Sequence, residues 1–465
     1  MQNLYNPLLN ISPLDGRYHD KLDTLRPLVS EYGLMRFRLN VEIEWFIHLS
    51  KHELLKEIPA LQPAEIKFLY DIVHNFSLDD AEQIKTIEKE TRHDVKAIEY
   101  FLKTKMEHNS NLASLKEFIH FACTSEDINN LSYACMLRDV RVQCLLPALE
   151  KITRHLRTLS HQYANVAMLS RTHGQIATPT TFGKEMANVV ARLSRQQSAL
   201  KNAEISGKIN GAVGNFNAHV CAYPELDWLS ICQTFVENLQ LHWEPYTTQI
   251  DPHDNLATFL DIVSRINIIL IDFSRDIWTY ISQDYLSQKM NKNDVGSSTM
   301  PHKINPIDFE NAEGNLGVSI ALSDHLSNKL PISRLQRDLS DSTVLRNLGL
   351  CFGHALLGYQ AISAGLDKIT LNQEKLSQDL ANHWEVLSEA IQTVMRRYGV
   401  DTPYEKLKAL TRGQDLDRKK LHAFIDAQIL PDPVKIQLKL LRPDLYIGYA
   451  ERLATELGSH CPDEP

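Results

Sequence analysis

Apolar residues recur at helical spacing in stretches of the chain that contain neither glycine nor proline. One such stretch runs from residue 253 to residue 295. Within it, apolar residues follow one another every three or four positions: Leu256, Leu260, Val263, Ile266, Leu270, Phe273, Ile277 and Ile281. This spacing places apolar side chains on one face of a helix. The pattern predicts one long amphipathic helix, which needs partner helices to cover its apolar face.

A second stretch without glycine or proline, residues 64–146, also predicts helix. The alternation typical of strands is almost absent, and neither a solenoid repeat nor a low-complexity segment is present. The last hundred residues carry shorter amphipathic runs interrupted by prolines. Together these patterns predict an all-α protein built around a bundle of long helices.

Length and composition narrow the class further. A chain of 465 residues exceeds the usual size of a single core, so we expect more than one domain. The net charge of -9 offers no general basic field, so we expect no nucleic-acid partner, although a local cationic pocket for a small anion remains open. No apolar stretch approaches the ~20 residues that span a bilayer, and the first residues lack the pattern of a signal peptide. We therefore expect a cytoplasmic protein without a membrane partner.

The cysteines and histidines do not form a metal-binding pattern. The seven cysteines lack a C-x-x-C pair, and no H-E-x-x-H motif is present. We expect neither a metal ion nor a disulfide framework.

Candidate chemistry is concentrated in residues 296–306, which read Gly-Ser-Ser-Thr-Met-Pro-His-Lys-Ile-Asn-Pro. Gly296 can act as a hinge, while backbone N–H groups and Lys303 suit a carboxylate or a developing oxyanion. Ser297 or Ser298 would then be the base. On composition alone, an ordinary surface loop is the alternative.

This string resembles the signature of the fumarase/aspartase superfamily, Gly-Ser-Ser-x-Met-Pro-x-Lys-x-Asn. Members of that family eliminate fumarate from substrates that carry a succinyl group. The resemblance implies an all-α, three-domain fold whose central bundle of long helices assembles into a tetrameric helical core. It implies an N-terminal helical domain at 1–111, a central long-helix domain with the signature loop at 112–365, and a C-terminal helical domain at 366–465. It also implies a homotetramer with shared active sites and no cofactor.

Three motifs in the first third of the chain resemble substrate-binding segments of this superfamily. The turn ending in Arg17-Tyr18 would bind a phosphate, although alone it is typical of a surface turn. The triplet Arg92-His93-Asp94 lies in a run that predicts helix, where a solvated face is the alternative; by resemblance it contacts substrate, and His93 assists the general acid.

The third of these motifs is Thr124-Ser125, which precedes an apolar periodic run and so also predicts a helix N-cap. By resemblance, both side chains would hydrogen-bond a carboxylate of the succinyl group.

Two further segments belong to the middle of the chain. In Arg171-Thr-His173-Gly174-Gln, a histidine before a glycine can simply end a helix and interact with its dipole. The resemblance instead makes His173 the general acid that protonates the leaving nitrogen. The glycine-rich segment Gly211-Ala-Val-Gly214 would form a backbone turn near the site, and Gln249 would contact substrate.

After the signature loop comes an arginine-rich segment, residues 334–347, whose arginines would be solvated on an ordinary helix. It resembles the superfamily branch that acts on phosphorylated nucleotides, in which such arginines and a Ser-Thr pair bind phosphate and ribose. The implied reaction is elimination of fumarate from a succinylated purine nucleotide, with His173 as general acid and Ser297, activated by nearby positive charge, as general base. The implied substrate-binding residues are Arg17, Tyr18, Arg92, His93, Asp94, Thr124, Ser125, Gln249, Ser298, Lys303, Asn305, Asn311, Arg337, Ser342, Thr343 and Arg346.

Two alternatives remain open. A sister lyase such as argininosuccinate lyase, aspartase or fumarase would share the signature loop but should lack the arginine-rich segment and Arg17-Tyr18. A catalytically inactive helical scaffold would be expected to lack the acid or the base, whereas His173 and Ser297 are both present.

Overall fold

The computed structural model describes residues 7–289, 299–300, 302–411 and 416–457. The predicted helical class is confirmed: helices dominate the described part of the chain, which holds only three two-stranded sheets besides them. The chain divides into two compact units, each assembled from separate segments. The predicted domain boundaries near residues 111 and 366 stay predictions.

Unit 1 comprises Met1–Ala148, Ala199–Ile268 and Gly314–Gly358. Its buried apolar core draws mainly on the long helices α2 and α7, which pack on each other, and on α5. Its elements are η1 (Pro7–Leu9), η2 (His19–Lys21), α1 (Arg26–Val29), α2 (Glu31–Leu49), α3 (Pro63–His74), α4 (Leu78–Thr91), α5 (Asp94–Met106), α6 (Ser110–Ala113), η3 (Lys116–Phe118), α7 (Ser125–Val140), the π-helical turn η4 (Arg141–Leu145), β3 (Ser206–Gly207), α10 (Asn217–Ala222), α11 (Trp228–Asn238), β4 (His242–Trp243) and α14 (Ser340–Leu345).

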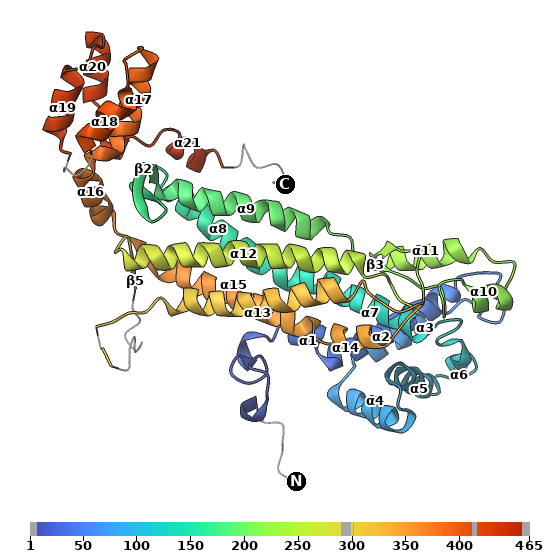
Figure 1. The fold of residues 1–465 in the computed structure, drawn as a ribbon. Coiled ribbons are helices and arrows are strands. Elements are labelled where there is room, and N and C mark those ends of the chain that lie inside the picture. The colour runs from blue at the N-terminus through green and yellow to red at the C-terminus, as the bar shows by residue number, and fades with distance from the viewer. Residues whose placement is uncertain (1–6, 290–298, 301, 412–415, 458–465) are drawn as a thin grey trace. The chain divides into compact units, whose positions relative to one another are not determined.

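Unit 2 comprises Leu149–Ser198, Ile269–Glu313 and Tyr359–Pro465. Its last helices enclose a separate apolar cluster around Leu387, Ile391 and Met395, and Figure 1 shows α17 to α20 gathered together. The elements within unit 2 are β1 (Ala167–Thr172), β2 (Gln175–Thr181), β5 (Leu286–Gln288), β6 (Ile369–Leu371), α16 (Gln373–Asn382), η5 (Trp384–Leu387), α17 (Ser388–Arg397), α18 (Pro403–Thr411), α19 (Arg418–Asp426), α20 (Asp432–Lys439), η6 (Pro443–Leu445) and α21 (Ala450–Thr455).

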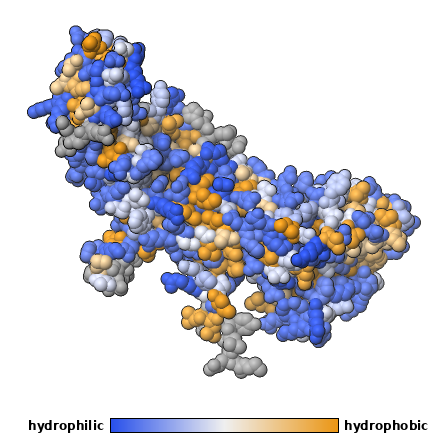
Figure 2. Space-filling model, in the orientation of Figure 1, coloured by the Kyte–Doolittle hydropathy of each residue, from blue (hydrophilic) through white to orange (hydrophobic). Residues whose placement is uncertain are grey.

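Five helices contribute residues to both units: α8 (Leu146–Gln162), α9 (Phe182–Asn202), α12 (Asp254–Ser282), α13 (Ile307–Lys329) and α15 (Leu348–Lys368). Helix α12 confirms the long helix predicted from the apolar spacing. The predicted apolar positions from Leu256 to Ile277 are buried and Ile281 is half-buried, while Asp261 and Arg275 on the opposite face are exposed. Polar side chains cover most of the face drawn in Figure 2, with smaller apolar areas between them.

The stretch 64–146 is divided into several helices, although the absence of glycine and proline predicts continuous helix. Capping side chains divide it: Ser77 caps α4, Asn109 caps α6 and Thr124 caps α7. The prediction that Arg92-His93-Asp94 lies inside a helical run is therefore wrong. Arg92 adopts left-handed angles (φ 54°, ψ 32°) that end α4, and His93 caps the next helix.

The segment around His173 also differs from the sequence-based interpretation. It does not follow directly on a helix, because α8 ends at Gln162 and an antiparallel hairpin, β1–β2, follows. Thr172 pairs with Gln175, so His173 and Gly174 form the two-residue turn, and both have positive φ (53° and 75°). Positive φ at both central residues is the pattern of type I′ hairpin turns. The interpretation of His173 as a residue that ends a helix is wrong.

Candidate functional site

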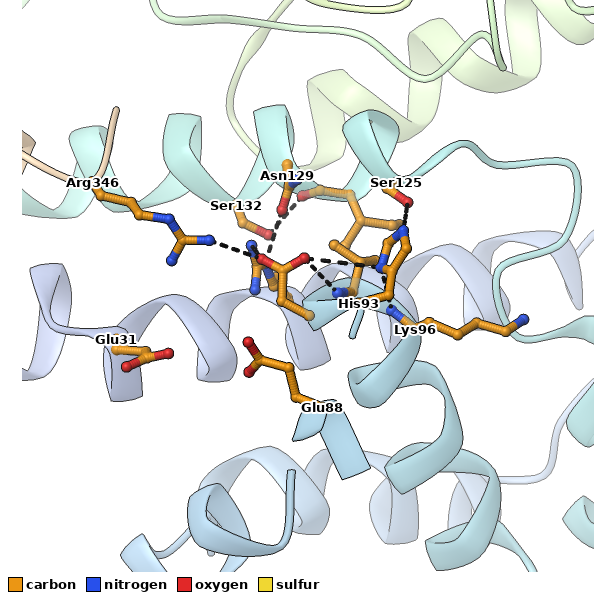
Figure 3. Close-up of polar contacts among 12 residues, drawn as sticks. Glu31, Glu88, His93, Lys96, Ser125, Asn129, Ser132 and Arg346 are labelled. Carbon is orange, nitrogen blue, oxygen red and sulfur yellow. Dashed lines mark hydrogen bonds and ion pairs between the residues drawn. The ribbon is translucent and has the colours of Figure 1, made fainter. Parts of the chain in front are cut away.

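The break between α4 and α5 orients His93 in unit 1. As the N-cap of α5, His93 accepts a hydrogen bond at Nδ1 from the Lys96 amide at 3.2 Å, while its Nε2 lies 3.4 Å from Ser125 Oγ. A neutral imidazole whose Nδ1 accepts a hydrogen bond carries its proton on Nε2. Nε2 is therefore the donor, and it faces Ser125 on α7 (Figure 3).

Asp94, at the start of α5, holds two arginines. Its Oδ2 lies 2.7 Å from a terminal nitrogen of Arg38 and 3.2 Å from a terminal nitrogen of Arg346. Burial alone would raise the pKa of Asp94, but the charges of Arg38 and Arg346 outweigh burial and hold that pKa below its usual range. Asp94 is therefore a carboxylate that links α2, α5 and the residue at the end of α14.

The first turn of α7 is held by a buried ion pair. Thr124 and Asp127 form a capping box, in which the Thr124 amide donates to Asp127 Oδ2 at 2.7 Å. The same carboxylate lies 2.8 Å from Lys208 Nζ, and neither side chain is exposed. It also accepts from the Asn210 and Gly211 amides, each at 3.1 Å. The predicted capping role of Thr124 is confirmed, and the glycine-rich segment is anchored to the turn that carries Thr124 and Ser125.

Arg337 lies in the segment before α14 rather than on an exposed helix face. One terminal nitrogen donates to Gln249 Oε1 at 3.2 Å and the other to Glu126 Oε1 at 2.8 Å. The backbone amide of Gln249 also donates to the backbone carbonyl of Gln336 at 3.3 Å. Two residues predicted to contact substrate, Gln249 and Arg337, are thus in direct contact.

Unit 1 also contains the other predicted residues from the first part of the chain and from α14. Arg17 is exposed, with its guanidinium carbon 6.0 Å from the centre of the Tyr18 ring. Ser342 and Thr343 lie on α14, half-buried and exposed respectively, one turn before Arg346. Arg92 is exposed at the end of α4. Arg17, Arg92, Ser342 and Thr343 take no part in the hydrogen bonds described above for His93, Asp94, Gln249, Arg337 and Arg346.

The remaining predicted residues belong to unit 2. His173 is exposed at the tip of the β1–β2 hairpin. Lys303 is exposed, its amide donating to the Met300 carbonyl at 3.0 Å, and Asn305 is half-buried just before α13. Asn311 is exposed in the first turns of α13. Ser297 and Ser298 lie outside the described residues.

The sequence-based reasoning missed three residues that connect the predicted ones: Arg38, Glu126 and Asn129. Residues 121–130 form a decapeptide rich in polar side chains that includes Glu126 and Asn129, so a signal for these two residues was present. Arg38 carries no comparable signal, because it is one of several charged residues in α2. All three side chains are buried in the structure.

The chemistry that this part of unit 1 favours is the recognition of an anion. Arg346 and Arg337 present guanidinium groups, which match the oxygens of carboxylates and phosphates. The N-terminus of α7, with Thr124 and Ser125, adds hydrogen-bond donors of the kind that bind anions. Among the described residues, no group of three or more His, Cys, Asp or Glu could hold a metal ion, and no described helix is long and apolar enough to cross a membrane.

Comparisons with known proteins extend these observations over nearly the whole chain. A family described as Lyase matches residues 16–319, and one described as Adenylosuccinate lyase C-terminal matches residues 333–447. The adenylosuccinate lyase of Escherichia coli K12 is 54% identical over 450 residues, which cover 97% of this chain and 99% of that protein. The adenylosuccinate lyase of Haemophilus influenzae is 52% identical over 451 residues, with 97% and 99% coverage.

Solved structures with lower sequence identity share the fold. The fumarate lyase from Mesorhizobium sp. BNC1 aligns with a TM-score of 0.75 at 14% identity, over 94% of this chain and 98% of that one. The 3-carboxy-cis,cis-muconate lactonizing enzyme from Pseudomonas putida aligns with a TM-score of 0.72 at 18% identity, over 94% and 96%. The mainly helical architecture is therefore common to proteins of widely different sequence.

Proposed function

Because this chain belongs to the adenylosuccinate lyase family of carbon–nitrogen lyases, we propose that it eliminates fumarate from adenylosuccinate to give AMP. We extend the proposal to succinylaminoimidazole carboxamide ribotide, which would give the corresponding amide and fumarate in purine nucleotide biosynthesis. The observation that carries the proposal is 54% identity over 97% of the chain and 99% of the Escherichia coli enzyme.

The elimination needs a base, an acid and stabilisation of a carbanion. The base removes a proton from the carbon beside a carboxylate, the electrons form the double bond of fumarate, and the carbon–nitrogen bond breaks. Ser297 is the proposed base and His173 the proposed acid that protonates the leaving nitrogen, a task suited to a histidine near neutral pH. Lys303, Asn305, Ser298 and Asn311 are the proposed ligands of the succinyl group in unit 2.

The contacts within unit 1 support a role for its predicted residues in binding the nucleotide end of the substrate. Arg337 and Arg346 are arginines of the type that bind phosphate. Arg337 donates a hydrogen bond to Gln249, and Arg346 donates one to Asp94. The backbone of His93 and its N-cap bond fix the ring with Nε2 as the donor, which supports hydrogen bonding to substrate rather than proton abstraction by that atom. Arg17, Tyr18, Arg92, Ser342 and Thr343 complete the proposed set at this end, while Thr124 and Ser125 are proposed to hydrogen-bond a carboxylate of the succinyl group.

We also propose a cytoplasmic homotetramer whose active sites combine residues from different subunits, without a cofactor. Apolar side chains exposed on the long helices support the association: Ile268 (40%) and Trp278 (45%) on α12, and Val318 (45%) on α13. Large apolar side chains left on a helix face are typical of surfaces that another chain covers. Sedimentation at several concentrations would measure the number of subunits.

The test of the activity is the change of ultraviolet absorbance when purified protein is mixed with adenylosuccinate, run in parallel with argininosuccinate, aspartate and malate. Conversion of adenylosuccinate alone is the expected result. His173→Ala and Ser297→Ala should abolish it, and His161→Ala, which changes another exposed histidine of unit 2, should not. Turnover of a different succinyl compound would reassign the substrate, and full activity in His173→Ala would remove that residue from the role of acid.

A further inference from the structure

A line of polar contacts runs through unit 1 from Arg337 to Asp94 by way of residues that have no predicted role. Arg337 donates to Glu126 at 2.8 Å, and Asn129 Nδ2 donates to the same Glu126 oxygen at 2.7 Å. Asn129 Oδ1 accepts from Arg38 Nε at 2.8 Å, and Arg38 continues to Asp94 at 2.7 Å. The line therefore connects two residues of the proposed binding set through three buried side chains from α2 and α7.

Burial makes this line rigid. Glu126 is 3% exposed, Arg38 4% and Asn129 8%. A carboxylate or guanidinium at such depth has to be paired, because water cannot replace a lost partner. Asn129 is engaged at both ends of its amide, so it cannot turn over without breaking two bonds to charged groups. Figure 3 shows Asn129 and Ser125 projecting from α7, with Arg346 reaching toward the same region.

The guanidinium of Arg337 is divided between protein contacts and open donors. It has five N–H bonds. Glu126 and Gln249 take one from each terminal nitrogen, which fixes the plane of the group. Nε is buried and has no hydrogen-bond partner among the described residues; Asp341 Oδ1 is 3.9 Å away, beyond hydrogen-bonding distance. The donors left for a ligand are therefore the second N–H of each terminal nitrogen.

We propose that Glu126 is a positioning residue: it fixes the guanidinium plane of Arg337 so that the remaining N–H of each terminal nitrogen receives the phosphate of the nucleotide substrate. The inference rests on the proposed function for the identity of that anion. Glu126 acts through Arg337 and does not touch the substrate. Its bond to Asn129 ties this orientation to Arg38 and Asp94, so Arg337 and the carboxylate that pairs with Arg346 belong to one fixed frame.

The test compares wild-type protein with Glu126→Gln, which keeps the shape and one acceptor oxygen but removes the charge. Glu99→Gln is the matched control, because Glu99 is also buried (4% exposed) and ion-paired, to Lys96 and Lys103. Steady-state kinetics with adenylosuccinate give KM and kcat separately, and calorimetry gives the affinities for AMP and for adenosine, which lacks the phosphate. If Glu126→Gln does not fold, Asn129→Ser tests the same line, because its shorter side chain cannot bridge Glu126 and Arg38.

The expected result is a KM increased about tenfold in Glu126→Gln, the effect of one charge-assisted hydrogen bond, with kcat changed less. AMP should bind about tenfold more weakly while adenosine binding stays unchanged, and Glu99→Gln should match wild type. Equal loss of AMP and adenosine affinity, or an unchanged KM, would overturn the positioning role while wild-type turnover leaves the proposed function standing. Absence of turnover in the wild-type protein would instead refute the proposed function.

Discussion

The buried pair Lys208–Asp127 offers a direct test of how the glycine-rich segment is held on the first turn of α7. The perturbation is Lys208→Met, which preserves most of the side-chain volume and removes the ammonium group. Asp127 then loses one contact at 2.8 Å but keeps the amides of Thr124, Asn210 and Gly211. The carboxylate therefore remains buried and only partly compensated.

The size of the effect follows from these partners. Removing one member of a buried ion pair lowers the free energy of unfolding by about 3–5 kcal/mol. Lys208→Met should lie near the lower value, about 3 kcal/mol, because three backbone amides still donate to Asp127. Asp127→Asn is expected to be worse, near 5 kcal/mol, because the buried ammonium of Lys208 would face only neutral acceptors, the amide oxygen of the new side chain and the Gly211 carbonyl at 3.3 Å, in place of a carboxylate. The double variant contains neither charge. Its loss of unfolding free energy should therefore be smaller than the sum of the losses of the two single variants, by more than about 2 kcal/mol.

Native-state hydrogen exchange of the Asn210 and Gly211 amides measures the local stability where it changes. A loss near 3 kcal/mol corresponds to about a hundredfold faster exchange when local opening precedes exchange. Lys201→Met, at an exposed position at the end of α9, is the control and should leave exchange nearly unchanged. Additivity of the two single variants to within about 0.5 kcal/mol would refute the reasoning, because independent effects mean that the pair is not a unit.

Three other substitutions test separate features of unit 1. Burial lowers the pKa of His219 to about 4, and neither ring nitrogen has a hydrogen-bond partner among the described residues. The unfolded chain therefore binds more protons below pH 6.5, and the stability of the wild-type protein falls by about 3 kcal/mol toward pH 4. His219→Phe cannot take up this proton and should not show that loss when thermal unfolding is measured against pH. Gly214→Ala should destabilise by about 1–3 kcal/mol, because φ is 81° and a Cβ would overlap the Thr247 carbonyl oxygen; an unchanged unfolding temperature would contradict this. Asp94→Asn should lower the unfolding temperature at pH 7. The difference between the unfolding temperatures of variant and wild type should become smaller as the pH falls below about 4, because the lowered pKa keeps Asp94 charged, and stabilising, until acid protonates it.

The long-range periodic features were predictable from the sequence, and the breaks between elements were not. The apolar spacing fixes α12 because a helix of this length is specified by many positions that agree. The end of α4 depends on one residue, Arg92, in a left-handed conformation that no residue type there announces. The β1–β2 hairpin was missed because its turn is His-Gly rather than the Asn-Gly or Asp-Gly that marks such turns.

The contacts of the candidate site were not predictable from the sequence. The motifs name Asp94, Gln249 and Arg337, but nothing in their spacing indicates that Glu126 and Arg38 join them. Those contacts cross large sequence separations, since Arg337 and Glu126 are 211 positions apart. Such partners are fixed by how helices pack, which depends on the core as a whole. The polar decapeptide 121–130 held the signal for Glu126, but helix capping accounted for its composition equally well.

Asp94 binds two arginines of different character, and that difference explains how a residue already in an ion pair can still serve a ligand. Arg38 is 5% exposed in its side chain and lies 2.7 Å from the carboxylate, so this pair resists separation and keeps Asp94 charged. Arg346 is 49% exposed at 3.2 Å, and an exposed pair of this kind contributes only about 0–1 kcal/mol. An incoming anion can therefore share or take Arg346 at little expense, while the pair with Arg38 holds Asp94 in place. The exposed arginine is the exchangeable one, which makes its ion pair with Asp94 compatible with the proposed role in binding the substrate.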